Sequence, residues 1–327
     1  MSETKTRKKD RLMWGLIYAG AFLAAFAVSA AFKLTWNPLG DQYSVQWGDS
    51  VGTLYTDLSY GPGEANKFDL YLPAGDTRET YGLVVYLHAG GFTSGDKVGD
   101  VEMLQWLCSK GYVAAGINYT LFSEEHPDAN VYTQSVEIRD SIPYVLAAAE
   151  ERGYQIDRMA ISGGSAGHTL AMLYTYRDGP DSPVPVKLTF GAVGPSCFYP
   201  EDWGCFGLDQ GTEESHAAAA AMFGLMAGET IPPEMIGTPE YDEAVKNISA
   251  VSWIDEDSPP TVCAYGAHDK VQAFPASQRL AAALEEHGVP HVYIVFPHSG
   301  HGLQNDNKLY ARYMDKVCEY LDAYMGV

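Results

Sequence analysis

The sequence is short of positive charge. Its 327 residues hold 21 Lys and Arg against 42 Asp and Glu, which gives a formal net charge of −21. A chain this acidic repels the phosphate backbones of DNA and RNA and the headgroups of anionic lipids. We therefore exclude nucleic-acid binding. With 46% hydrophobic residues, the composition is that of a folded protein rather than a disordered one.

Cysteine is also scarce, and patterns typical of metal sites are missing. The five cysteines include no C-x-x-C pair and the histidines do not cluster at metal-ligand spacing, so we predict no metal. Cys108, Cys263 and Cys318 stand in apolar stretches and are expected to be core thiols. Cys197 and Cys205 share a loop, where a disulfide and two free thiols fit the sequence equally well.

The few cations are concentrated at the N-terminus. Five of them lie in residues 1–11, and residues 12–32 follow as 21 residues without a charged side chain. As a helix this run would cross a bilayer core of roughly 30 Å, and the flanking cations would keep their own end in the cytoplasm. We expect a basic cytoplasmic tail and a transmembrane signal anchor, with a cleaved signal peptide as the alternative. Both interpretations place the rest of the protein outside the cytoplasm.

Residues 33–50 are expected to be a linker and residues 51–327 a single domain. Within it, short β-rich runs alternate with longer helical segments, which is typical of an α/β fold. Continuous apolar runs such as Leu83–Leu87 suit a mostly parallel sheet with helices on both faces. Strands are predicted at residues 53–58, 67–72, 83–87, 113–118, 158–162, 188–193, 261–265 and 292–296, and helices at 101–109, 132–151, 166–176, 272–286 and 307–324.

Two features interrupt this alternation. Pro143 lies inside the second predicted helix and predicts a kink or a break there. Residues 194–258 contain no convincing strand and are expected to form a lid-like insertion over the sheet. Its large apolar side chains either line a substrate pocket or pack the insertion onto the body. They are Phe198, Tyr199, Trp203, Phe206, Met222, Phe223 and Met226.

Residues that can carry chemistry are concentrated at Gly163-Gly164-Ser165-Ala166-Gly167, a G-x-S-x-G sequence between a predicted strand and a predicted helix. A serine on such a tight turn is held in a strained conformation with its hydroxyl exposed. The helix N-terminus beside it favours developing negative charge. The motif alone is also compatible with a plain glycine-rich turn, so its weight depends on what accompanies it.

Three further segments follow predicted strands: His88-Ala89-Gly90-Gly91-Phe92, Gly266-Ala267-His268-Asp269 and Ser299-Gly300-His301-Gly302. Backbone N–H groups of the first segment and of Ala166 can stabilise an oxyanion. The others supply an acid and a base in the chain order Ser, Asp, His that accompanies a G-x-S-x-G turn. His298 and His268 compete with His301 as the base, but His298 precedes the turn and the side chains of adjacent His268 and Asp269 are expected to diverge.

With these segments in place, the sequence resembles α/β-hydrolase carboxylesterases, close to the hormone-sensitive-lipase-like and bacterial feruloyl-esterase-like (BD-FAE) families. The resemblance implies the α/β-hydrolase fold, with Ser165 as nucleophile, Asp269 as orienting acid and His301 as base. It also implies an oxyanion hole made by the backbone N–H groups of Gly90, Gly91 and Ala166. The matching segments are 67–73, 88–92, Ser94-Gly95-Asp96-Lys97, Ile117-Asn118-Tyr119, the Ser165 turn, 266–269 and His301-Gly302, which span most of residues 53–324.

Two residues depart from the pattern of these families. Ala89 replaces the first glycine of the usual H-G-G-G, and His168 occupies a position where relatives often have glycine. The two glycines that resemble the oxyanion donors, Gly90 and Gly91, are present, so we expect activity to survive.

The function implied is a serine hydrolase that cleaves carboxylic esters of small or aryl substrates through an acyl-enzyme, with no cofactor. An arylformamidase-like amide hydrolase is the alternative within enzymes, because such enzymes share the His-Gly-Gly loop. A non-catalytic hydrolase-fold binding module is the alternative from another class, although such modules generally lose a member of the triad. The expected partners are a small ester and, through the N-terminal segment only, a membrane; the sequence leaves the oligomeric state open.

Overall fold

The computed structural model describes residues 43–75 and 78–326. The chain divides into two units, residues 1–44 and 45–327, and the second contains the sheet and every candidate site residue. The membrane anchor predicted for residues 12–32 lies outside the described residues. Across the described ranges, the structure contains no helix that combines the length and the apolar character needed to cross a bilayer.

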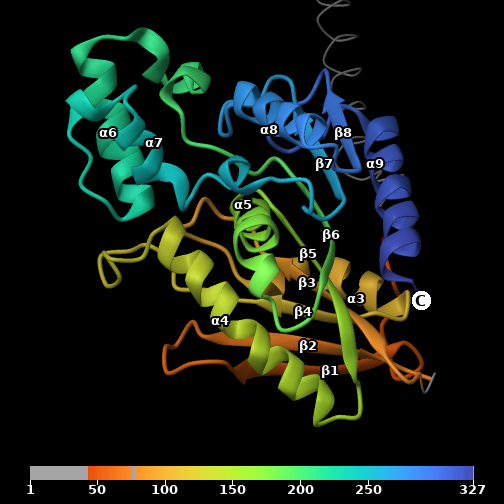
Figure 1. The fold of residues 1–327 in the computed structure, drawn as a ribbon. Coiled ribbons are helices and arrows are strands. Elements are labelled where there is room, and N and C mark those ends of the chain that lie inside the picture. The colour runs from red at the N-terminus through yellow and green to blue at the C-terminus, as the bar shows by residue number, and fades with distance from the viewer. Residues whose placement is uncertain (1–42, 76–77, 327) are drawn as a thin grey trace, which may run out of the picture. The chain divides into compact units, whose positions relative to one another are not determined.

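Eight strands form one sheet in the order β1-β2-β4-β3-β5-β6-β7-β8 (Figure 1). The antiparallel pairs are β1 with β2 and β2 with β4, and all other neighbours are parallel, as the apolar strands predict. In chain order the strands are Gly52–Ser59, Lys67–Pro73, Tyr81–Leu87, Val113–Ile117, Ile156–Gly164, Val186–Ala192, Thr261–Gly266 and His291–Phe296.

Helices cover the sheet on both sides, with α4 and α5 in front of it and α3 behind it in the view of Figure 1. The α-helices predicted at 166–176 and 307–324 end at Leu173 and Tyr320. Each is followed by a single π-helical turn, at residues 174–178 and 321–325. The helices of the body are α3 (Val101–Ser109), α4 (Val131–Glu150), α5 (Ala166–Leu173), α8 (Phe274–Glu286) and α9 (Asn307–Tyr320).

Pro143 does not break α4, so the predicted break is wrong. The helix runs without interruption from Val131 to Glu150. Its N-terminus has a capping box in which Asn130 and Thr133 each accept a hydrogen bond from the other's backbone N–H. One face of the helix is fully buried at Ile138, Ile142 and Val145, and this burial outweighs the one backbone hydrogen bond that proline cannot make.

The centre of the sheet is buried on both faces. In β3, Leu83, Val84 and Val85 are all fully buried although successive side chains point to opposite faces, because helices cover both sides. The parallel strands β3, β5, β7 and β8 all end at the same edge of the sheet. The loops that carry the four candidate segments therefore meet at that edge.

Residues between β6 and β7 form the insertion expected from the sequence, built from α6 (Glu213–Ala227), α7 (Pro239–Lys246) and short 3-10 turns. The rings of Phe198, Trp203 and Phe223 lie 5.4 to 5.7 Å apart between centroids and are almost fully buried. Of the two roles open to these aromatic side chains, packing is therefore the one that the structure shows.

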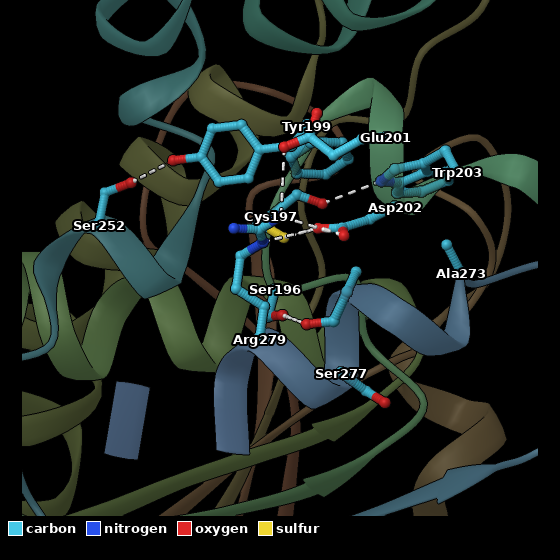
Figure 2. Close-up of polar contacts among 12 residues, drawn as sticks. Ser196, Cys197, Tyr199, Glu201, Asp202, Trp203, Ser252, Ala273, Ser277 and Arg279 are labelled. Carbon is cyan, nitrogen blue, oxygen red and sulfur yellow. Dashed lines mark hydrogen bonds and ion pairs between the residues drawn. The ribbon is translucent and has the colours of Figure 1, made fainter. Parts of the chain in front are cut away.

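A polar cluster ties the insertion to α8 (Figure 2). Arg279 of α8 donates from Nε and Nη2 to the two carboxylate oxygens of Asp202, at 2.7 and 3.1 Å, and its guanidinium lies 5.0 Å from the ring centroid of Tyr199. Glu201 accepts from the same guanidinium at 3.2 Å. A bidentate pair of this kind orients its two partners, so the insertion has a defined position on the body.

The cysteines are free thiols, including both members of the pair for which a disulfide was one possibility: Cys197 is buried and Cys205 is exposed. Cys108 and Cys263 are buried as expected, whereas Cys318 on α9 is only half-buried.

Candidate active site

Ser165 lies on the turn between β5 and α5 with φ 50° and ψ −119°, a conformation that non-glycine residues rarely adopt. Its N–H donates to the carbonyl of Ala192 on β6 at 2.8 Å. The turn depends on neighbouring glycine, because a Cβ on Gly167 would lie 2.0 Å from the carbonyl oxygen of Leu87. The strained turn holds the hydroxyl of Ser165 at the carboxyl edge of the sheet.

His301 and Asp269 meet Ser165 in a chain of hydrogen bonds. His301 Nε2 lies 2.9 Å from Ser165 Oγ, and His301 Nδ1 lies 2.8 Å from Asp269 Oδ2. The other carboxylate oxygen of Asp269 accepts backbone N–H groups from Val271 and Gln272 at 2.8 and 3.0 Å. With Nδ1–H donating to the carboxylate, Nε2 is left to accept the Ser165 hydroxyl proton, which is the geometry of a nucleophile, a base and an orienting acid.

The competing histidines have other surroundings. His298 Nδ1 contacts Asp306 Oδ1 at 2.8 Å, and 77% of the His298 side chain is exposed. The side chain of His268 is exposed, while its backbone N–H donates to the carbonyl of Ser299 at 3.0 Å. The structure thus brings His301 to Ser165 and keeps the other two histidines outside this contact.

The loop after β3 supplies the second predicted element of the site. Gly90 and Gly91 have φ values of 137° and 60°, and Phe92 follows at 68°. The carbonyl of Gly90 accepts from Ser94 N–H at 3.0 Å and from Ser94 Oγ at 2.9 Å. In the described part of the chain, the backbone N–H groups of Gly90, Gly91 and Ala166 make no hydrogen bond to other protein groups. They are available as donors to an oxyanion.

His88 and Tyr119 pack against each other at the start of this loop. Their rings stack with centroids 4.3 Å apart, and the Tyr119 hydroxyl donates to the carbonyl of His88 at 2.9 Å. Burial lowers the pKa of His88, so the ring is neutral and its Nδ1–H can donate to the carbonyl of Ala89 at 2.8 Å. The Ala89 side chain is exposed, which explains why alanine is accommodated in place of glycine.

His168 is packed beneath the Ser165 turn. It is fully buried, and burial lowers its pKa to about 3, so it remains neutral. Its Nδ1 accepts the backbone N–H of Gly194 at 3.2 Å. The histidine that replaces glycine here therefore joins α5 to the segment after β6 and is not positioned to act as a base.

Asp306 has a role that the sequence did not predict. It is the N-cap of α9, yet its side chain does not cap that helix. Oδ2 accepts instead from the N–H of His298 at 3.0 Å and from the hydroxyl of Ser299 at 2.6 Å. Since Ser299 and His298 begin the loop that carries His301, Asp306 fixes the conformation of that loop. The only sequence signal was an acidic residue just before a helix, which normally indicates a cap.

Lys97 is a second buried group whose role the sequence left unassigned. Only 4% of its side chain is exposed, and its Nζ lies 2.8 Å from Asp57 and 3.3 Å from Asp69. Its backbone N–H donates to Asn118 Oδ1 at 2.7 Å. These contacts join β1, β2 and the segment after β4 to the end of the Gly90 loop.

Two family models match the chain. The BD-FAE family matches residues 68–184 and the prolyl oligopeptidase family matches residues 215–327. The first match contains the Gly90 loop and Ser165, and the second contains Asp269 and His301. The resemblance to the BD-FAE family inferred from the motifs is thereby confirmed over the first of these ranges.

Two curated relatives and one solved structure complete the comparison. A probable carboxylic ester hydrolase, LipM, of Mycobacterium tuberculosis is 31% identical over 36% of this chain and 27% of its own. Dipeptidyl aminopeptidase BIII of Pseudoxanthomonas mexicana is 26% identical over 84% of this chain and 37% of its own. The match thus spans between about a quarter and two fifths of the length of these relatives. Esterase B of Lactobacillus rhamnosis superposes with a TM-score of 0.60 at 20% identity, covering 93% of this chain and 98% of the esterase.

The sheet order, the helices on both faces and the structural neighbour together confirm the α/β-hydrolase fold. The chain has this fold, and Ser165, His301 and Asp269 lie in hydrogen-bonded sequence at the carboxyl edge of its sheet.

The two glycines of the oxyanion loop are expected to differ in their tolerance of alanine. A Cβ on Gly90 would lie 1.8 Å from the carbonyl oxygen of Ser94, whereas a Cβ on Gly91 meets nothing within 4 Å. Gly90→Ala should therefore slow the reaction of Ser165 with a fluorophosphonate about 100-fold or more, the scale of losing one oxyanion donor. Gly91→Ala should slow the same labelling reaction less, because its only cost is the strain of a positive φ in alanine, about 1–2 kcal/mol. Equal losses in the two variants would show that the steric contact at Gly90 does not set the loop.

Removal of the Asp306 carboxylate is expected to misplace His301. Asp306→Ala should slow fluorophosphonate labelling of Ser165 at least about tenfold, since each hydrogen bond to a charged group contributes roughly 1.5–3 kcal/mol. Asp306→Asn keeps one acceptor oxygen, so its labelling rate should lie between those of the wild type and Asp306→Ala. Asp315→Ala, on the exposed side of the same helix, is the control. Labelling of Asp306→Ala at the control's rate would mean that the loop holds its shape without this carboxylate.

Proposed function

We propose that the protein is a serine hydrolase that cleaves carboxylic esters of small or aryl substrates. The observation that carries this proposal is the hydrogen-bonded sequence from Ser165 Oγ through His301 to Asp269, at 2.9 and 2.8 Å. The ester hydrolases among the similar proteins support the choice of ester over other acyl groups.

The proposed reaction proceeds in two steps. Ser165 Oγ attacks the ester carbonyl carbon as its proton passes to His301 Nε2, and the carbonyl oxygen becomes an oxyanion held by the N–H groups of Gly90, Gly91 and Ala166. The alcohol then leaves with the proton from His301, and an acyl-enzyme remains. Water attacks the acyl carbon with the same histidine as base, and the carboxylic acid is released.

Asp269 contributes by orientation and charge. Its two backbone hydrogen bonds fix one oxygen, so the other points at His301 Nδ1 and stabilises the imidazolium that forms during attack. Protein groups and water supply every step, and the scheme needs no cofactor.

Amides are the alternative acyl substrates. The prolyl oligopeptidase family model matches the part of the chain that carries Asp269 and His301, and a dipeptidyl aminopeptidase is similar over 84% of the chain. Peptide p-nitroanilides and aryl formamides therefore belong in the substrate panel beside esters.

Ser165→Ala is expected to abolish hydrolysis of p-nitrophenyl acetate, with kcat/KM reduced by at least about 10³-fold, because the nucleophile is removed. Ser252→Ala, whose hydroxyl contacts Tyr199 on the insertion, is the matched control and should keep the wild-type rate. Far-UV circular dichroism checks that both variants are folded. Near-wild-type turnover by Ser165→Ala would refute the proposal. If the wild type cleaved amides faster than esters, the substrate class would be an amide and not an ester.

We further propose that the N-terminal segment attaches the hydrolase to a membrane, with the catalytic domain outside the cytoplasm. The proposal rests on the uncharged run of 12–32 behind five cations. Full-length protein should sediment with membranes after a carbonate wash, and a version beginning at Asp41 should not. A mature protein whose first residue lies near 28 or 31 would instead establish a cleaved signal peptide.

A further inference from the structure

A cavity of about 200 Å³ lies directly against His301. Its walls come from elements that are distant in sequence, including Tyr86 at the end of β3, Met103 of α3, Val193 after β6, Leu303 of the His301 loop and Tyr310 of α9. A larger cavity of about 290 Å³ lies beside Tyr81 and Lys110, and Tyr81 is the first residue of β3, at the edge opposite Ser165. Of the two, only the smaller is lined by a member of the Ser165–His301–Asp269 sequence, and that member is His301.

Two residues with a strained backbone line this cavity. In the described residues, five non-glycine residues have positive φ: Asp57, Phe92, Ser165, Val193 and Leu303. Val193, at φ 51°, and Leu303, at φ 53°, both line the cavity, and both are 94% buried. Positive φ is costly for a bulky residue and for a β-branched one above all, and such strain persists where the surroundings enforce it, commonly at functional sites.

The lining defines the kind of group that fits. It includes aromatic rings, aliphatic side chains and the thioethers of Met103 and Met314, and no Asp, Glu, Lys or Arg of the described chain contributes to it. An apolar cavity of about 150 Å³ is known to hold benzene, so about 200 Å³ accommodates one aromatic ring with a small substituent. A charged group would lose its hydration here without gaining an Asp, Glu, Lys or Arg as an ion-pair partner.

The position of the cavity assigns it to one half of the substrate. His301, Gly302 and Leu303 form part of its wall, whereas none of the predicted oxyanion donors does. The group that must lie beside His301 during catalysis is the departing alcohol, because His301 Nε2 protonates its oxygen. In the proposed reaction the acyl carbonyl lies between Ser165 and the oxyanion donors, and none of these residues lines the cavity.

We infer that this cavity binds the alcohol portion of the ester, and that the protein prefers esters whose leaving group is uncharged, apolar and no larger than about one aromatic ring. This inference rests on the proposed ester hydrolysis and specifies its substrate class. Met103 and Tyr310 are then specificity-determining residues for the leaving group.

Two series of esters test the assignment. In one, the acyl group is acetyl and the alcohol is methyl, butyl, benzyl or naphthylmethyl. In the other, the alcohol is methyl and the acyl group is lengthened from acetyl to octanoyl. The wild type should show kcat/KM rising to the benzyl ester and falling at least about tenfold for the naphthylmethyl ester, since the larger ring system exceeds the cavity.

Met103→Trp fills the cavity and should lower the ratio of kcat/KM for benzyl acetate to that for methyl acetate at least about tenfold. The order of rates in the acyl series should stay as in the wild type. Tyr310→Ala enlarges the cavity and should raise the relative rate on naphthylmethyl acetate, which keeps the test decisive if Met103→Trp does not fold. Leu225→Trp, a tryptophan at an exposed position of α6, is the control and should leave both series unchanged.

A change confined to the acyl series in either variant would assign the cavity to the acyl group and overturn the inference. An unchanged benzyl-to-methyl ratio in folded Met103→Trp together with an unchanged profile in Tyr310→Ala would also overturn it. Both results leave ester hydrolysis standing, because the esters are still turned over. Absence of turnover of every ester by the wild type would instead refute the proposed function.

Discussion

The site depends on the close approach of two backbones at the carboxyl edge of the sheet. Gly167, just after the Ser165 turn, faces the end of β3 so closely that a Cβ would lie 2.0 Å from the carbonyl oxygen of Leu87. This approach fixes the Ser165 hydroxyl relative to the Gly90 loop, which follows β3 directly. Any side chain at position 167 would push the two apart. One contact between main chains thus positions the proposed nucleophile relative to the proposed oxyanion donors.

A second backbone contact sets the other half of the site. A Cβ on Gly266 would lie 2.3 Å from the carbonyl oxygen of Gly300, so the loops that carry Asp269 and His301 pack directly against each other. The hydrogen bond from His268 N–H to the Ser299 carbonyl joins them again. The 2.8 Å contact between Asp269 and His301, the proposed acid and base, is therefore supported by the packing of the two loops as well as by the side chains themselves.

The sequence predicted the residues that follow strand ends, and it missed the residues whose role depends on their side-chain partners. Ser165, Asp269 and His301 could be placed together because each follows a buried strand, and parallel strands end at a common edge. Asp306 could not be assigned, because an acidic residue before a helix is normally its cap and here serves the preceding loop. The continuity of α4 through Pro143 was missed for a related reason, since propensity was outweighed by burial against the sheet, which only the tertiary structure shows.

The attachment of the insertion to α8 has a consequence for inactivation by heat. Four residues separate Asp269 from Phe274, where α8 begins, and Arg279 on that helix binds Asp202 of the insertion. Asp269, the proposed orienting acid, and the insertion are therefore both connected to α8. Loosening of the insertion on warming would be transmitted to the Asp269 segment, so activity would decline before the sheet unfolds. Local opening at the insertion would then set the temperature at which activity is lost, below the temperature at which the sheet unfolds.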